Sequence, residues 1–176
     1  MKSIFTKSFL ALLFLGVISI TACNNDDDDD DNNCGTTGTL EASWKVNGVE
    51  EKAYLSFHSH TVSLLNLSFL SCSGPNNAVL LNFIPYPPSV GTYELKYGPL
   101  SSPIKGLATY IDESVGTSGV SYATNDTITG TFTITDVDLS AKTLSGTFSF
   151  DGLKEDGSGV INTITEGQIF NTVYED

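Results

Sequence analysis

From about Gly35 onward, alternation of apolar and polar side chains at every second residue recurs along the chain, and no stretch keeps the i, i+3, i+4, i+7 apolar spacing of an amphipathic helix. Alternation is clearest over 127–135 and 143–150, where isoleucine, leucine and phenylalanine face one way and threonine or serine the other. This pattern is typical of β-strands with one face in water. A Gly-Thr-Phe echo at 130–132 and 146–148 predicts that these two strands are adjacent and antiparallel, joined by residues 136–142.

Turn-forming residues separate further strands. Asn47-Gly48 lies between two alternating segments and predicts a hairpin, because both residues accept positive φ. Residues 61–70 and 78–84 carry apolar side chains at both odd and even positions, which predicts central strands covered on both faces. Further strands are expected over 91–95, 107–111, 160–164 and 168–174, with a flexible loop over 112–119.

About ten short strands with frequent turns and no helix predict an all-β fold. We expect an antiparallel β-sandwich formed by a single domain over residues 35–176. The alternative is a lipocalin-like β-barrel, which the sequence favours less because a ligand-holding barrel usually has a more regular up-and-down rhythm of strands.

Residues 1–22 are interpreted as a signal peptide. Lys2 and Lys7 precede an apolar run over 9–20, which is shorter than the roughly 20 residues of a membrane-spanning helix. The run ends in the sequence ITAC at 20–23, which resembles the bacterial lipoprotein box. The resemblance implies that Cys23 is acylated and becomes the mature N-terminus. An ordinary secretory signal with an unrelated cysteine is the alternative.

Residues 23–34 are interpreted as an acidic tether. The six consecutive aspartates at 26–31 repel one another and offer nothing to bury, which predicts an extended, disordered segment. The tract resembles the export signal of surface-exposed lipoproteins of Bacteroidota. It therefore predicts a lipid-anchored outer-membrane protein, either displayed on the cell surface or held in the periplasmic leaflet.

Charge excludes one class of partner. The chain has 21 acidic residues, eight lysines and no arginine, and its formal net charge is −13. Nucleic-acid binding depends on lysine and arginine contacts with phosphates, so we expect no nucleic-acid partner. Residues 35–176 hold 15 of the acids and six of the lysines, a net charge of −9. We therefore expect membrane contact through the lipid on Cys23 and not through charge.

Four segments carry a family resemblance, namely ASWKVNG at 42–48, GTY at 91–93, LSGTFSF at 144–150 and ITEGQIF at 164–170. In this order they resemble the small uncharacterised β-domain lipoproteins of Bacteroidota, which are catalogued as domains of unknown function. The resemblance implies an all-β fold and an envelope location, but no activity and no functional residues.

His58 and His60 are the only histidines, and their spacing on a strand puts both side chains on one face. With a carboxylate such as Glu51 they would be weak candidates for a zinc site, and a solvated pair is the commoner alternative. No Gly-x-Ser-x-Gly turn accompanies them, so we expect no hydrolase triad and no enzyme activity. No motif points to a cofactor.

Three further groups of residues are candidates for a site or a modification. Asp136 and Asp138 begin like a calcium loop but lack its later glycine and glutamate, and an Asx turn explains them equally well. Cys34 and Cys72 either form a disulfide after export or remain free thiols. Thr127, within Asp-Thr-Ile, resembles the O-glycosylation acceptor of Bacteroidota.

Aromatic residues are candidates for a sugar-stacking surface by residue type alone, and packing in or beside the core is the alternative. They are Trp44, Tyr86, Tyr93, Tyr97, Tyr110 and Tyr122. Two functions from different classes remain. One is a binding or interaction module for glycans or a partner protein, and the other is a structural envelope lipoprotein without a small ligand.

Overall fold

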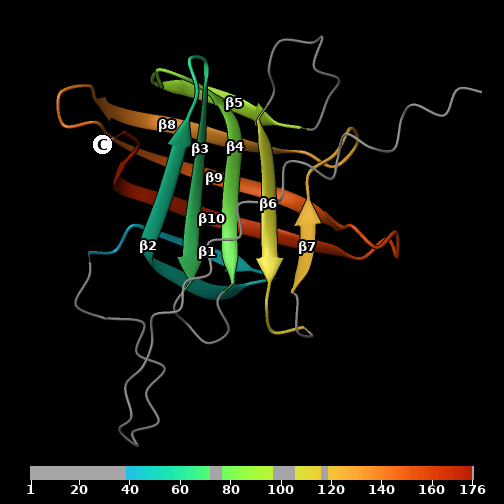
Figure 1. Ribbon diagram of the computed structural model, residues 1–176. Coiled ribbons are helices and arrows are strands. Elements are labelled where there is room, and N and C mark those ends of the chain that lie inside the picture. The colour runs from blue at the N-terminus through green and yellow to red at the C-terminus, as the bar shows by residue number, and fades with distance from the viewer. Residues whose placement is uncertain (1–38, 72–76, 97–105, 116–118, 176) are drawn as a thin grey trace, which may run out of the picture. The chain divides into compact units, whose positions relative to one another are not determined.

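The computed structural model describes residues 39–71, 77–96, 106–115 and 119–175, all within a compact unit that spans Asn32–Asp176 (Figure 1). Ten strands are found in these residues: β1 Ala42–Val46, β2 Val49–His60, β3 Leu64–Ser71, β4 Ala78–Pro85, β5 Gly91–Leu95, β6 Leu107–Asp112, β7 Val120–Ala123, β8 Gly130–Asp138, β9 Thr143–Lys154 and β10 Ile161–Val173. The strand pairs are antiparallel, so the prediction of an antiparallel all-β fold of about ten strands is confirmed.

The strands form one sheet that closes on itself. Its order is β10-β1-β2-β3-β4-β6-β7-β9-β8-β5, and β10 also pairs with β9. The closed circuit therefore contains eight strands, while β8 and β5 extend from the edge of β9. β9 pairs with β10 along one edge, and its other edge is shared between β8, over Thr143–Phe150, and β7, at Leu153 and Lys154.

The preference for a sandwich is wrong, and the structure matches the barrel alternative. The prediction treated apolar residues on both parities of 61–70 as a sign of cover on both faces. In β3 only the inward side chains are fully buried, as Leu65, Leu67 and Phe69 show, whereas Leu64 and Leu70 point outward and stay partly exposed. Apolar residues on both parities are equally compatible with a barrel whose outer face is partly apolar.

Two predicted pairs of neighbouring strands are confirmed. Asn47 and Gly48 join β1 to β2 with φ angles of 49° and 88°, as expected for a two-residue hairpin turn. The Gly-Thr-Phe echo lies on the paired strands β8 and β9, where Phe132 is directly opposite Phe148.

Two details of the C-terminal half differ from the predictions. The segments expected at 160–164 and 168–174 are one strand, β10, interrupted by register shifts at which Glu166 and Asn171 adopt positive φ. The four-residue strand β7 follows the predicted loop and was not foreseen, because so short a segment has no clear alternation.

One hydrophobic core is built from side chains of the closed strands and of the two added strands, β5 and β8. The largest fully buried ones are Trp44, Phe69, Leu65, Leu67, Leu81, Ile84, Leu95, Tyr110, Phe132, Ile134, Leu144 and Tyr174. Since these residues belong to one core cluster, to which the closed strands and the added strands β5 and β8 all contribute, the unit 32–176 has a core of its own, and we expect it to fold without the preceding residues. Among the residues that the structure describes, no helix has the length and apolar character required to cross a membrane.

Closure of the barrel brings the backbone of β7 against Gly152 of β9. A Cβ atom built on Gly152 would lie 2.8 Å from the carbonyl oxygen of Tyr122 and 2.9 Å from its Cβ. Only glycine leaves room for this approach, since the contacting atoms belong mainly to the backbone of the neighbouring strand.

Replacing Gly152 with alanine should lower the free energy of unfolding by about 1–3 kcal/mol, because the added methyl group forces β7 away from β9. Urea denaturation of the unit 32–176 measures the change. Thr131→Ala, at an exposed position of β8, is the control and should stay within about 0.5 kcal/mol of the unsubstituted chain. Equal stability of the Gly152→Ala variant and the parent would contradict the steric role of this glycine.

Candidate functional site

The outward side chains of β8, β9 and β10 form a surface rich in hydroxyl groups. Outward positions alternate with the buried phenylalanines, so that Thr131 and Thr133 on β8 stand opposite Ser149 and Thr147 on β9. Thr147 is in turn opposite Gln168 on β10. We call these five side chains, Thr131, Thr133, Thr147, Ser149 and Gln168, the hydroxyl face.

The row continues onto β5, where the hydroxyl oxygens of Thr92 and Thr133 lie 3.0 Å apart. Hydroxyl and amide groups are therefore aligned across four neighbouring strands. Each can both donate and accept hydrogen bonds.

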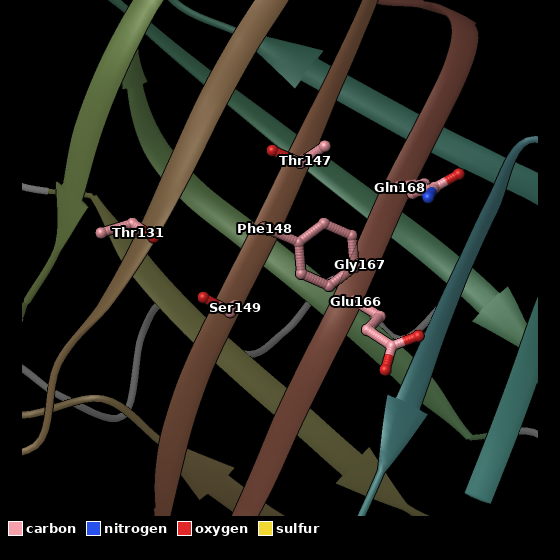
Figure 2. Close-up of a pocket in the computed structure, with 7 residues that line it drawn as sticks. All are labelled: Thr131, Thr147, Phe148, Ser149, Glu166, Gly167 and Gln168. Carbon is pink, nitrogen blue, oxygen red and sulfur yellow. The ribbon is translucent and has the colours of Figure 1, made fainter. Parts of the chain in front are cut away.

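A shallow open groove runs over the hydroxyl face (Figure 2). Its volume is about 290 Å³, and it is lined by Thr131, Thr147, Phe148, Ser149, Glu166, Gly167 and Gln168. Figure 2 shows the polar side chains on neighbouring strands around the groove, with the Phe148 ring between β9 and β10. A second groove of about 250 Å³ adjoins it along the same strands, lined in part by Thr129, Asp151, Thr163 and Thr165.

Charge at the first groove is limited to one ion pair at its border. Lys45 of β1 lies 2.7 Å from the carboxylate of Glu166, and both side chains are exposed. The remaining polar groups of the lining are neutral. The arrangement therefore suits a neutral ligand with many hydroxyl groups. Such a ligand can form hydrogen bonds with the neutral side chains of the groove and does not need to break the ion pair at its border.

His58 and His60 are not grouped with Glu51, the carboxylate considered above as a third zinc ligand. His58 and His60 lie in the second half of β2, and the ring of His60 stacks on Tyr86 with centroids 4.5 Å apart. Glu51 lies near the start of the strand, before a register shift between Ala53 and Leu55. In the described part of the chain, no group of three or more histidine, cysteine, aspartate or glutamate side chains could hold a metal ion.

Glu51 belongs to a buried polar cluster. Its Oε1 accepts hydrogen bonds from Asn77 Nδ2 at 2.8 Å and from the Tyr110 hydroxyl at 3.0 Å. Burial, with the nearby negative charge and hydrogen bond of Glu51, raises the pKa of Tyr110. Asn77 also accepts the backbone N–H of Glu113, so the cluster connects β2, β6 and the start of β4. Glu51 therefore connects separate strands through its hydrogen bonds, and its known partners are Asn77 and Tyr110 and not the histidines.

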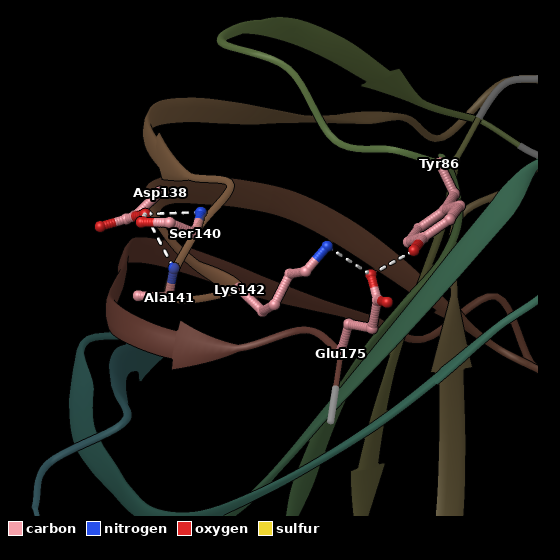
Figure 3. Close-up of polar contacts among 6 residues, drawn as sticks. All are labelled: Tyr86, Asp138, Ser140, Ala141, Lys142 and Glu175. Atoms are coloured by element: carbon pink, nitrogen blue, oxygen red, sulfur yellow. Dashed lines mark hydrogen bonds and ion pairs between the residues drawn. The ribbon is translucent and has the colours of Figure 1, made fainter.

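Asp138 forms an Asx turn and not a calcium loop. Figure 3 shows its carboxylate accepting the backbone N–H groups of Ser140 and Ala141, each at 2.8 Å. The hydroxyl of Ser140 donates to the same oxygen, and these bonds lower the pKa of Asp138. Asp156 is similar, since bonds from Lys154 and Ser158 lower its pKa to about 2. Turn chemistry thus accounts for both aspartates.

The C-terminal end of β10 carries a cluster that sequence reasoning missed. Glu175 accepts a hydrogen bond from the Tyr86 hydroxyl and lies 3.3 Å from Lys142 Nζ (Figure 3). The hydrogen bond to Glu175 raises the pKa of Tyr86 to about 12. The same hydrogen bond lowers the pKa of Glu175, and the interaction with Lys142 lowers it further. Residues 86, 142 and 175 share no motif, and only the folded sheet brings them together.

The aromatic candidates do not form an exposed platform among the described residues. Trp44, Tyr110 and Tyr122 are buried. Tyr86 and Tyr93 are partly buried and pack against the core, so edge or core packing, the alternative given above, describes these five. Tyr97 lies outside the described residues.

Modification sites and cysteines complete the list of candidates. Thr127 is exposed in the loop between β7 and β8, where its hydroxyl donates to Asn125 at 3.0 Å. Cys23, Cys34 and Cys72 lie outside the described residues, so the acylation and disulfide predictions remain predictions.

Comparison with known proteins gives one match. The family model described as Domain of unknown function (DUF6252) matches residues 46–173, which is almost the whole barrel. No curated protein and no solved structure shows significant similarity to the chain.

Replacing Tyr86 with phenylalanine should raise the pKa of Glu175 toward its ordinary value of 4.5, because it removes the hydrogen bond that lowers this pKa most. A carboxyl with a lowered folded-state pKa adds stability above its ordinary value, and this stability is lost as the pH falls through the folded-state pKa. The variant should therefore lose less stability on acidification. NMR titration of the Glu175 side chain measures the pKa directly.

Tyr93→Phe is the matched control for this titration, since the Tyr93 hydroxyl donates to the carbonyl of Ser89 and not to Glu175. It should leave the pKa of Glu175 unchanged. The assigned cause is refuted if Tyr86→Phe also leaves that pKa unchanged.

Proposed function

The chain belongs to the DUF6252 family, a domain of unknown function, and from this premise we propose that it is a lipid-anchored binding module of the bacterial outer membrane that recognises glycans through its hydroxyl face. The observation that carries the ligand class is the alignment of neutral hydroxyl and amide groups across β5, β8, β9 and β10. Sugar hydroxyls are also both donors and acceptors. When a sugar displaces water from this surface, its hydroxyls can replace the hydrogen bonds of the water, and no unpaired charge is buried.

The shape of the site sets the expected strength of binding. The groove is open and shallow, and its one aromatic lining residue, Phe148, is only 3% exposed. Binding therefore depends on several hydrogen bonds, each with a modest net contribution of about 1 kcal/mol. We expect weak affinity for a single sugar and a preference for extended chains that follow both adjoining grooves.

The anchoring part of the proposal rests on the sequence of residues 1–34. The signal peptide, the ITAC sequence ending in Cys23 and the aspartates at 26–31 together favour a lipoprotein in the outer membrane, on the outer surface or in the periplasmic leaflet. Surface display would also suit O-glycosylation of Thr127, whose exposed position agrees with access by a modifying enzyme.

A structural envelope lipoprotein without a small ligand is the second candidate. The observation in its favour is that core side chains fill the barrel, so that the two grooves described above lie on its outer surface. The binding experiment below separates the two candidates.

Thr147→Val should weaken glycan binding by about 2- to 10-fold, because it removes one hydroxyl group at nearly constant volume. A glycan array with the unit 32–176 identifies the ligand, and titration calorimetry measures the affinity of the variant. Thr109→Val, the same change on β6 across the barrel, is the control and should bind like the parent. Absence of any glycan ligand, or equal losses in both variants, would favour the second candidate.

Cys23→Ser should abolish acylation and release the chain from the membrane fraction, because serine lacks the thiol that carries the lipid. Incorporation of labelled palmitate and fractionation of cells measure both effects, with Cys34→Ser as the control that retains the lipid. Replacing the aspartates at 26–31 with asparagine should retain acylation but reduce cleavage by protease added to intact cells. Continued membrane association of Cys23→Ser would contradict the lipoprotein assignment.

A further inference from the structure

The outer face of β2, β3, β4 and β6 is apolar, in contrast to the hydroxyl face. Leu55 is opposite Leu70, which pairs in turn with Ala78 and then Ile111, so one row across four strands is entirely apolar. The next row contains Phe57, Ser68, Leu80 and Thr109. We call the outward side chains of these two rows the apolar face. In Figure 1 its four strands are nearest the viewer, in front of β8, β9 and β10.

The apolar face is accessible along its β2 side. Leu55 and Phe57 are 40% and 42% exposed, although both are large apolar side chains in the middle of a strand. A register shift between Ala53 and Leu55 turns these two residues outward. Without this register shift, Leu55 and Phe57 would have the same parity as the inward Ala53 and would point into the core. With it, they are exposed to water.

Charge is absent from this part of the described sheet. β3, β4 and β7 contain no aspartate, glutamate, lysine or arginine, and neither do the residues of β2 after Lys52 or those of β6 before Asp112. His58 and His60 of β2 alternate with Leu55 and Phe57 and so have the opposite parity. The folded part of the chain nevertheless has a net charge of −9. Charged residues adjoin the face at its border, since the Glu50–Lys52 ion pair precedes Leu55 on β2 and Asp112 follows Ile111 on β6.

We propose that the apolar face is the surface through which two copies of this chain associate, face to face. Two acidic domains repel one another in most orientations, but this approach brings together surfaces without charge. It also buries apolar groups, and the hydroxyls of Ser68 and Thr109 are the only polar side chains in the two rows. An apolar centre with charged residues at its border is the usual composition of a protein interface.

The size of the face predicts a weak dimer. Four strands about 4.8 Å apart and two rows of outward side chains about 7 Å apart give roughly 270 Å² for each copy. A standard stable interface buries about 800 Å² on each partner. The association should therefore be visible only at high concentration in solution, and it becomes important where copies are concentrated, as on a membrane surface.

Sedimentation equilibrium of the unit 32–176, from about 10 µM to 1 mM, tests the proposal in the concentration range expected for so small an interface. We expect a monomer–dimer equilibrium whose dissociation constant falls when the NaCl concentration is raised. Salt screens the repulsion between the acidic surfaces outside the apolar face, while the apolar contact is retained. Phe57→Glu should weaken dimerisation at least about tenfold. Thr147→Glu adds the same charge on the hydroxyl face and should change it less than about twofold.

Two measurements keep the test decisive. If Phe57→Glu fails to fold, as judged by circular dichroism, concentration-dependent NMR shifts of the unsubstituted chain replace it and should be confined to the apolar face. A chain that stays monomeric at 1 mM overturns the proposal, and so does equal weakening by both glutamate variants. Binding of a monomeric chain to phosphatidylcholine vesicles in a Phe57-dependent manner would also overturn it, since the face would then contact lipid. None of these outcomes depends on whether the hydroxyl face binds glycans.

Discussion

The structure depends on the double pairing of β9. This strand holds β10 along one edge and divides the other edge between β8 and β7, so both ends of the sheet meet on it. Without the short pairing at Leu153 and Lys154, the strands from β1 to β7 would form an open sheet with unpaired edges. The missing side chain of Gly152 permits this pairing, because any Cβ there would contact the backbone of β7.

Closure also separates two surfaces of different chemistry. The strands next to β9 carry threonine, serine and glutamine outward, whereas β3 and β4, across the barrel, carry leucine, alanine and uncharged polar groups. Both surfaces are neutral although the chain is acidic. Acidic groups are found elsewhere, for example where strands end in turns, as Asp138 and Asp156 do, or near the chain end, as Glu175 does. The charge of the folded domain therefore says little about either face.

Features set by neighbouring residues could be predicted from the sequence, and those set by distant residues could not. The Asn47-Gly48 hairpin and the β8–β9 pair follow from turn chemistry and alternation. Closure does not, since an alternating strand has the same pattern in a sandwich and in a barrel. The bulge after Ala53 reverses the faces of β2, and no local signal marks it. The Tyr86–Lys142–Glu175 cluster could not be predicted for the same reason, since its residues are distant in sequence. For the hydroxyl face, the sequence shows the alternating threonines of each strand but not how the strands align them with one another.

The pairing of β1 with β10 has a consequence for the order of events in the cell. Ala42 and Ile169 are neighbours in the sheet although nearly the whole domain separates them in sequence. Contacts between such distant residues slow folding, and the barrel cannot be completed until its last strand has left the ribosome. Export of an unfolded chain, which the proposed outer-membrane location requires, would benefit from this delay, because the barrel that would block translocation closes only once β10 is available.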